Sequence, residues 1–246
     1  MTFRRNVLKA TMAAVLAGAA GMSFAQSDVL KVATDATFPP MEFMEEGKFT
    51  GFDVELVEAV AAKMGKKVEW VNIDFKGLIP GLVSKRFDMA VSAIYITDER
   101  KKVVDFTDAY YAGGLVALVK EGSPLQSPKD LNGKKVSVQV GTKSVLFLNE
   151  HYPKVQLVEV QKNQEMFNLV EIGRADAAVT GKPAAFQYVR TRGGMQVLPE
   201  QLTTEEYGMA VRKDLPELTK SINKALADLK ADGQYQAIVA KWFRNK

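Results

Sequence analysis

The chain has 246 residues, with 33 Lys and Arg against 29 Asp and Glu, one histidine and no cysteine. Its formal charge of +4 falls to +1 (30 − 29) once the three basic residues near the amino-terminal end are set aside, so neither nucleic acid nor an anionic membrane is predicted as a partner. The lack of cysteine excludes a disulfide framework, a thiol nucleophile and a zinc–thiolate site, and no cofactor or metal is predicted.

Residues 1–25 are predicted to be a secretory signal peptide. Arg4, Arg5 and Lys9 form a basic start, an alanine-rich apolar stretch covers residues 10–22, and Ser23-Phe24-Ala25 is a small-x-small cleavage site. The apolar stretch is shorter than the roughly 20 residues that span a bilayer, which argues against a membrane anchor. Because Arg4-Arg5 also resembles a twin-arginine motif, both export routes stay open. No cysteine near residue 25 offers a lipid-attachment site, so we expect a free periplasmic protein of a Gram-negative cell.

The first half of the mature chain alternates strands and helices. A β-branched run predicts the first strand, Asp53 is expected to cap the helix that follows, and Gly65 is expected to end it. The predicted order is strand 29–34, helix 53–64, strand 68–71, helix 77–85 and strand 89–93. This βαβαβ order requires a parallel sheet with helices on its faces.

The second half repeats this order, with strand 136–140, helix 144–150, strand 155–160, helix 164–172 and strand 175–179. In each half a helix end is followed by a basic residue, an Asp and an apolar strand that closes on a hydroxyl, Ser92 or Thr180. Connections of this kind between a helix and a strand look alike in many α/β proteins. The similarity of the two segments therefore does not decide whether the halves arose by duplication. Ligands sit beyond the carboxyl ends of parallel strands, and two facing sheets would place Ser92 and Thr180 on one cleft.

Arg100 ends the segment Ile94-Tyr95-Ile96-Thr97-Asp98-Glu99-Arg100, and its planar fork of donors matches a carboxylate. Further landmarks stand in the order found in one family: Ala33-Thr34-Asp35, Pro39-Pro40-Met41-Glu42-Phe43, Gly51-Phe52-Asp53 and Asp74-Phe75-Lys76-Gly77-Leu78-Ile79-Pro80. After residue 28 the chain therefore resembles the family 3 periplasmic substrate-binding proteins of polar amino acid ABC transporters, and the glutamine-binding members most closely.

The resemblance implies a two-lobed α/β fold of type II, like that of other periplasmic binding proteins, in which each lobe is a mostly parallel sheet flanked by helices. One lobe is expected to comprise residues 28–110 with 210–246, and the other residues 115–206. Hinge crossings are expected near 110–114 and 206–210, where glycines can absorb backbone rotation. Residues 216–243 read as two helices broken near Gly233, which by resemblance pack on the first lobe.

The resemblance also assigns binding roles. Arg100 would hold the α-carboxylate of the ligand, together with amides near Ser92 and Ala93 and the hydroxyl of Tyr95, where many relatives carry Thr or Ser. Taken alone, an arginine at a helix start is more often a surface residue, so this role rests on the resemblance. The other ligand-binding residues expected are Asp35, Phe38 and Phe75 in the first lobe and Gln139, Thr142, Lys143, Ser144, Thr180 and Gly181 in the second.

Most of these residues have a stated part in the site. By resemblance, Phe38 and Phe75 are aromatic walls, and Asp35 selects the side chain or the amino group of the ligand. The segment Gly141-Thr142-Lys143-Ser144 follows a strand and opens a helix, so its free N–H groups would point at the cleft. Gln139 stands where the glutamine binder has a lysine.

One position departs from the family. An acidic residue that pairs with the α-ammonium of the ligand is normal at the position of Gly181, and here Lys182 follows the glycine. Burial of an ammonium without a charge partner costs several kcal/mol. Either Asp35, Glu165 or Glu206 takes over the role of that acid, or the ligand has no α-ammonium.

The resemblance implies a trap that closes on a small polar amino acid, performs no chemistry on it and docks on an ABC permease in the inner membrane. We expect a monomer. The alternatives are a binder of a carboxylate that lacks an α-amino group and an enzyme on the same scaffold, of the cyclohexadienyl dehydratase type. An enzyme of that type needs a general acid or base in the cleft, and His151 reads as a solvated residue at a helix end.

Overall fold

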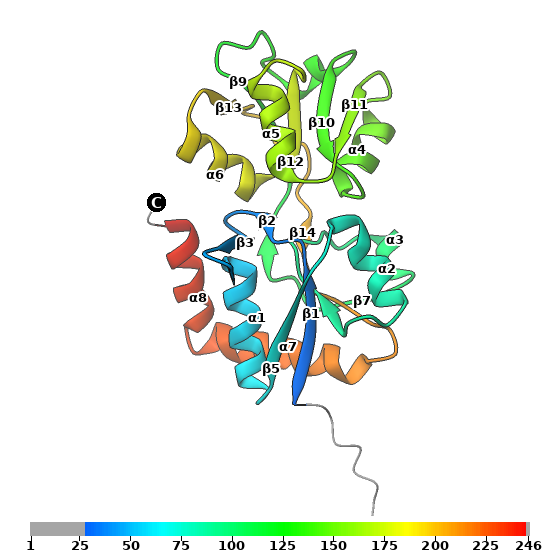
Figure 1. Cartoon of the computed structure of the whole chain (residues 1–246), viewed down its shortest axis with the longest axis vertical. Coiled ribbons are helices and arrows are strands. Elements are labelled where there is room, and N and C mark those ends of the chain that lie inside the picture. Colours follow the sequence, from blue (N-terminus) through cyan, green and yellow to red (C-terminus); the bar gives the residue numbers. More distant parts are fainter. Residues whose placement is uncertain (1–27, 245–246) are drawn as a thin grey trace, which may run out of the picture.

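The computed structural model describes residues 28–244, so the predicted signal peptide lies outside the described residues. The described chain forms two lobes, one above the other in Figure 1, which extended segments join. None of the helices within residues 28–244 is long and apolar enough to cross a membrane. The predicted α/β fold of two lobes, each with its own sheet, is confirmed.

The first lobe is built on a five-stranded sheet with the order β5 (Lys67–Asn72), β1 (Val29–Thr34), β6 (Met89–Ala90), β15 (Ala210–Val211) and β7 (Asp105–Phe106). Strand β1 is parallel to β5 and β6, whereas β15 is antiparallel to β6 and β7. A small sheet of β2 (Thr37–Phe38), β3 (Glu42–Glu45) and β4 (Lys48–Thr50) lies beside it. The late strand β15 completes a sheet that early strands began.

Helices cover both faces of this sheet. They are α1 (Phe52–Lys63), α2 (Leu78–Val83), α3 (Asp98–Lys101), α7 (Pro216–Ala231) and α8 (Gln234–Val239), with short turns η1 (Phe75–Gly77) and η3 (Ala240–Arg244). Side chains alternate along β1: Leu30 and Val32 belong to the apolar cluster that includes α1 and α7, and Ala33 belongs to a separate cluster with α2. The sheet is therefore buried on both sides, as its apolar strands predict.

The second lobe repeats the plan. Its sheet has the order β11 (Gln156–Val160), β10 (Lys135–Gln139), β12 (Ala177–Gly181), β9 (Leu115–Lys120) and β13 (Met195–Val197). Strand β10 is parallel to β11 and β12, and β9 is antiparallel to β12 and β13. The helical elements are η2 (Pro128–Leu131), α4 (Lys143–His151), α5 (Asn163–Glu171) and α6 (Lys182–Arg192). The carboxyl ends of β1 and β6 face those of β10 and β12 across the gap between the lobes (Figure 1).

Two short strands lie between the two sheets. Strand β8 (Tyr111–Ala112) pairs antiparallel with β14 (Glu206–Tyr207) in a separate two-stranded ladder. Both strands fall in the segments that the sequence marks as crossings. Strand β14 is also tied to the first lobe, because Tyr207 forms an isolated bridge with Tyr95.

Two local predictions are wrong. Asp53 does not cap α1, which begins after Gly51; its buried carboxylate accepts hydrogen bonds from the Ala93 amide (2.8 Å) and the Tyr110 hydroxyl (2.8 Å). Strand β6 ends at Ala90 instead of residue 93, because Ala93 adopts φ +46° and turns its N–H to Asp53. Both errors have one cause: a contact distant in sequence takes a backbone group that a local pattern assigned elsewhere.

Candidate ligand-binding site between the lobes

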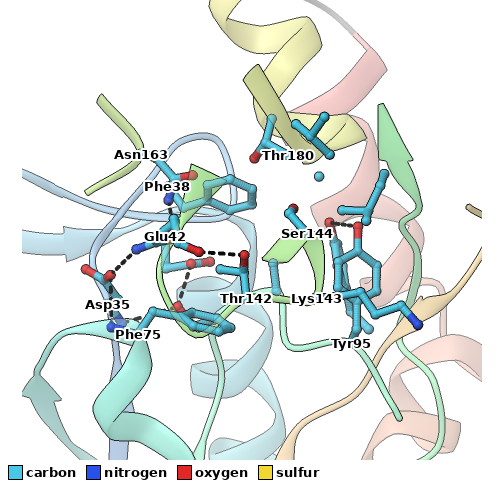
Figure 2. Close-up of a pocket in the computed structure, with 17 residues that line it drawn as sticks. Asp35, Phe38, Glu42, Phe75, Tyr95, Thr142, Lys143, Ser144, Asn163 and Thr180 are labelled. Carbon is cyan, nitrogen blue, oxygen red and sulfur yellow. Dashed lines mark hydrogen bonds between the residues drawn. The ribbon is translucent and has the colours of Figure 1, made fainter. Parts of the chain in front are cut away.

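A small cavity lies between the lobes, and Figure 2 shows side chains from both lobes around it. Every residue that the sequence places in the site lines this cavity, with the exception of Arg100. The sequence analysis missed five further residues that line the cavity: Glu42, Leu115, Asn163, Val179 and Tyr207. The rule that ligands sit beyond the carboxyl ends of parallel strands placed Ser92 and Thr180 on one cleft, and both line this cavity.

Asp35 lies at the end of β1 and is only 1% exposed. Each of its carboxylate oxygens accepts two hydrogen bonds. Oδ1 accepts from Thr37 Oγ1 (3.0 Å) and Lys162 Nζ (3.0 Å), and Oδ2 accepts from the Phe75 amide (3.1 Å) and Gln139 Nε2 (2.8 Å). Two of these donors belong to the first lobe and two to the second. The carboxylate is therefore fully paired and joins the lobes.

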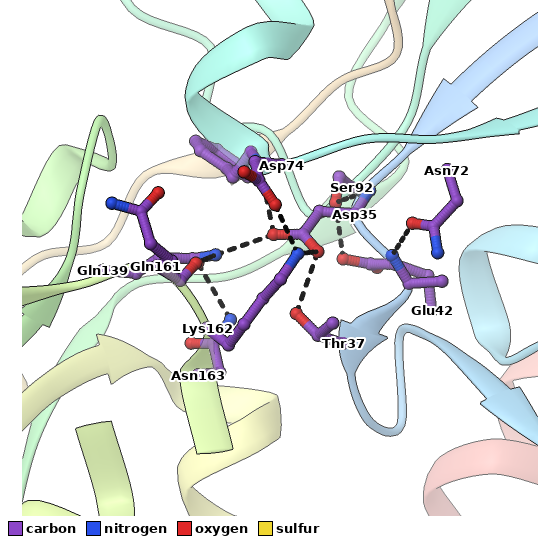
Figure 3. Close-up of polar contacts among 12 residues, drawn as sticks. Asp35, Thr37, Glu42, Asn72, Asp74, Ser92, Gln139, Gln161, Lys162 and Asn163 are labelled. Atoms are coloured by element: carbon purple, nitrogen blue, oxygen red, sulfur yellow. Dashed lines mark hydrogen bonds and ion pairs between the residues drawn. The ribbon is translucent and has the colours of Figure 1, made fainter. Parts of the chain in front are cut away.

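Lys162 is a binding-site neighbour that sequence reasoning missed. Figure 3 shows its side chain between Asp35 and Asp74, with Nζ 2.7 Å from Asp74 Oδ1. The hydrogen bond from Lys162 and its charge lower the pKa of Asp74. Lys162 comes just after β11, at the same edge of the sheet as the end of β10. The strand-end rule that singled out Ser92 and Thr180 would have found it.

Arg100 lies next to the cavity and does not line it. Its guanidinium donates to the Tyr95 carbonyl (Nη1, 2.8 Å) and to the Gly141 carbonyl of the other lobe (Nη2, 3.4 Å). The guanidinium carbon is 5.6 Å from the centre of the Phe75 ring, and burial lowers the pKa of Arg100 to about 10. In this position the guanidinium binds backbone carbonyls of both lobes, and direct contact with a ligand in the cavity would require the side chain to leave them.

The start of α4 forms the second-lobe wall. Thr142, Lys143 and Ser144 all line the cavity, and the positive end of the helix dipole lies there. Thr142 Oγ1 donates to the Gln139 carbonyl (2.7 Å), and Lys143 Nζ is paired with Glu205 Oε1 (2.8 Å). The helix start therefore offers backbone N–H groups and the buried Ser144 side chain to a ligand, whereas the two neighbouring side chains are engaged within the protein.

Glu42 is a second buried acid on the cavity wall, and its Oε1 accepts a hydrogen bond from Ser92 Oγ (2.7 Å). Burial, followed by the nearby Asp53 charge, raises the pKa of Glu42 well above its usual value; burial also raises the pKa of Asp53 to about 6. Glu42 Oε2 and Asp53 Oδ1 accept no hydrogen bond from any other group. One proton shared by the two carboxyl groups satisfies both, so Glu42 presents a neutral carboxyl to the cavity.

Thr180 and Gly181 close β12 and line the cavity, so the departure from the family falls within the site. Of the acids proposed to compensate for Gly181, neither Glu165 nor Glu206 lines the cavity, and both are exposed. His151 lies at the end of α4, where its ring stacks on Phe147 with centres 4.5 Å apart, away from the cavity. Within residues 28–244, no cluster of three or more His, Cys, Asp or Glu could hold a metal ion.

Comparison with known proteins agrees with this architecture. Residues 30–245 match the model of the bacterial extracellular solute-binding proteins, family 3. The L-cystine-binding protein TcyJ of Escherichia coli (strain K12) is 33% identical over 253 residues, which cover 97% of this chain and 95% of that protein. An ancestral arginine-binding protein with bound arginine is 42% identical and superimposes with a TM-score of 0.85, covering 88% of this chain and 99% of that one.

A third similar structure bears on the enzyme alternative. The ancestral amino acid-binding protein AncCDT-1, described as a precursor of cyclohexadienyl dehydratase, is 40% identical with a TM-score of 0.82 and covers 88% of this chain and 96% of that one. It is itself a binding protein, as are TcyJ and the ancestral arginine binder. The type II two-lobed fold and the interlobe cavity are thus those of a solute-binding protein, and the chain belongs to the bacterial extracellular solute-binding proteins, family 3.

Proposed function

We propose that this chain is the periplasmic solute-binding component of an ABC importer and captures an amino-acid-sized carboxylate in the cavity between its lobes. The observation that carries this proposal is the composition of the cavity wall, which takes residues from both lobes and is held shut by hydrogen bonds between them. Relatives named for L-cystine and arginine support the amino acid class. The partners we propose are the solute and an inner-membrane permease, with a monomer as the working form.

Hinge closure is the mechanism we propose. The lobes would be residues 28–110 with 210–246 and residues 115–206, rotating about the β8–β14 ladder. Lys162 and Gln139 of the second lobe reach Asp35 of the first, so closure forms bonds that an open cleft lacks. A ligand that touches both walls would add to these bonds and shift the population further toward the closed state.

For the carboxylate of the ligand we propose two partners, the N–H groups at the start of α4 and Arg100. The helix start already faces the cavity. Arg100 would leave the Tyr95 and Gly141 carbonyls, which are neutral acceptors. It would then form a stronger ion pair with the carboxylate of the ligand. Phe38, Ser92, Ala93, Thr142, Lys143, Ser144 and Thr180 would complete the contact surface.

For the tail of the ligand we propose a neutral polar group, such as the amide of glutamine. The four hydrogen bonds to Asp35 leave it no free acceptor for a cationic side chain of the arginine or lysine type. Gln139 lies at the same place, with its amide held by Asp35 and Asn163. A similar solved structure, of an ancestral arginine-binding protein bound to glutamine, supports such a tail.

The function can be tested by thermal-shift measurements on the exported protein, stripped of ligand by unfolding and refolding. The probes are the proteinogenic amino acids and carboxylates of matched shape that lack the α-amino group. A solute that stabilises the protein should lose at least tenfold in affinity in Arg100→Ala, because the carboxylate loses its charged partner. Arg174→Ala, which removes an exposed arginine outside the site, is the control. Equal affinity in wild type and Arg100→Ala would contradict the assigned carboxylate site.

A further inference from the structure

A pair of buried tyrosines fills the space beside Gly181. The hydroxyls of Tyr95 and Tyr207 are 3.2 Å apart, both residues line the cavity, and they are 6% and 0% exposed. A Cβ atom at Gly181 would overlap the Tyr207 hydroxyl and would lie 3.2 Å from Phe38 Cζ and 3.5 Å from the Tyr95 hydroxyl. The volume that any side chain at position 181 would enter is therefore occupied by this tyrosine pair.

The tyrosine pair is also in close contact with Gly113. A Cβ atom at Gly113 would lie 2.7 Å from Tyr207 Cζ and 3.0 Å from a ring carbon of Tyr95. The rings themselves pack with centres 4.7 Å apart, and the Tyr207 carbonyl accepts a hydrogen bond from the Tyr110 amide (3.0 Å). Two glycine backbones thus pack closely against the tyrosine pair, and a side chain at either position would overlap Tyr207.

The tyrosine pair differs chemically from a carboxylate. A carboxylate is negatively charged and only accepts hydrogen bonds, whereas each phenol is neutral and carries one donor. One of the two O–H groups is used between the tyrosines, so the other is free to donate into the cavity. Burial raises the pKa of both hydroxyls above the usual value of a tyrosine, which keeps the two protons in place at neutral pH.

None of the acids that line the cavity supplies a negative charge beside the tyrosine pair, and the nearby Glu205 lies outside the lining with its Oε1 paired to Lys143. Asp35 and Glu42 are the acidic residues among those lining the cavity. The Asp35 carboxylate has all four acceptor positions occupied within the protein, one of them by Lys162, and Glu42 shares a proton with Asp53. In Figure 2 Asp35 and Glu42 lie on the opposite side of the view from Tyr95. A buried ammonium beside the tyrosine pair would lack a charge partner, which is costly, whereas an oxygen acceptor would gain a donor.

We propose that the solute of this cleft is a 2-hydroxy or 2-oxo acid. Its α-oxygen lies where an amino acid would place its ammonium, and it accepts a hydrogen bond from the free hydroxyl of the tyrosine pair. This inference rests on the proposed function and specifies its ligand class. An α-oxygen has nearly the size of the nitrogen it replaces, so the carboxylate and the tail keep the positions argued above. Tyr95 and Tyr207 are then the residues that determine specificity at the head of the ligand.

Calorimetric titration of the ligand-stripped protein with matched pairs tests this proposal. The pairs are L-alanine and L-lactate, L-phenylalanine and phenyllactate, L-leucine and 2-hydroxyisocaproate, and L-glutamate with 2-hydroxyglutarate and 2-oxoglutarate. The α-oxygen acid should bind at least tenfold more tightly than its amino acid in the pairs that bind. Tighter binding of the amino acids would overturn the inference and leave the proposed function standing. Absence of binding in every pair, together with no response to the proteinogenic amino acids, would remove both.

Variants locate the preference within the cleft. Tyr207→Phe and Tyr95→Phe each remove one hydroxyl, and each should weaken the α-oxygen acid about tenfold while the amino acid changes little. The double variant Gly181→Asp with Tyr207→Phe makes room for a carboxylate, and it should reverse the preference in favour of the amino acid. Tyr152→Phe, outside the cavity, is the control. An unchanged preference in both single variants would show that the tyrosine pair does not select the ligand.

Discussion

The two polar ends of the cavity are built in opposite ways. At one end Asp35 is a buried charge whose partners come from both lobes, so its hydrogen bonds depend on how far the cleft is closed. At the other end the tyrosine pair is neutral and packs closely against the Gly113 and Gly181 backbones. In the mechanism proposed above, the charge at the first end favours closure of the cleft, and the shape of the second end limits which solutes fit. A single cavity can therefore separate the drive to close from the choice of ligand.

The largest effect is expected from Asp35→Ala. This change removes four hydrogen bonds, leaves Gln139 without its partner across the cleft and leaves Lys162 only Asp74 there, so stability should fall by about 3 kcal/mol. Asp74→Ala is the matched control, because Asp74 binds the same Lys162 nitrogen but is half exposed; its loss should cost less than about 1 kcal/mol. Urea unfolding measures both. Equal losses of stability in the two variants would mean that the burial of Asp35 does not strengthen its interactions relative to those of the half-exposed Asp74.

Overpacking at the tyrosine end should have the next largest effect. Gly181→Asp places a side chain where the Tyr207 hydroxyl lies, and it should lower stability by about 1–3 kcal/mol. Removal of that hydroxyl in the double variant with Tyr207→Phe should recover most of the loss. A double-mutant cycle measured by urea unfolding gives the coupling between the two positions. Additive losses would contradict the close contact that the structure shows.

The contribution of charge to closure can be measured without a ligand. Lys162→Met removes the interlobe ion pair and keeps the length of the side chain, so the lobes should separate more often. Small-angle X-ray scattering of ligand-free protein should then give a larger radius of gyration than the wild type. Lys129→Met, an exposed lysine on the second lobe, is the control. A radius unchanged by Lys162→Met would show that packing alone holds the cleft shut.

The smallest effect is expected from the shared proton of Glu42 and Asp53. Both pKa values are raised in the folded protein, to about 6 for Asp53, so the folded state holds protons more tightly than the unfolded state. Their contribution to stability is full below the unfolded values near pH 4 and is lost as pH rises through about 6. Glu42→Gln replaces the protonated acid with a permanent donor.

The stability of Glu42→Gln relative to the wild type should therefore increase by on the order of 1 kcal/mol as pH rises from about 4 to 7. The difference between the two melting temperatures measures this increase. The comparison must be made between the two proteins at each pH, because Asp74 and Asp214 have lowered pKa values and change stability in the opposite direction. A constant difference between the two melting temperatures at all pH values would contradict the shared proton.

Local sequence patterns predicted a helix or strand well where a single pattern covered the whole element. The β-branched run at 29–34 and the apolar periodicity before Gly65 predicted β1 and α1 almost to the residue. The strand-end rule placed two residues of the cavity wall on one cleft, since residues that follow parallel strands gather at one edge of a sheet. The pattern failed at Asp53, whose partners Ala93 and Tyr110 are 40 and 57 positions away in the chain. A helix-capping motif covers only a few neighbouring residues, so it does not indicate that distant groups bind the same carboxylate.

The amino-acid sequence by itself indicated the two-lobed α/β plan and the family, because these follow from periodicity and short motifs, and the resemblance to that family named nearly all of the cavity lining. Only the tertiary structure decided the state of the polar groups. It paired Asp35 with Lys162 across the lobes, turned Arg100 toward backbone carbonyls and set Tyr207 against Gly181. The physical reason is that burial, pairing and free space depend on residues far apart in the chain, so no local pattern encodes them.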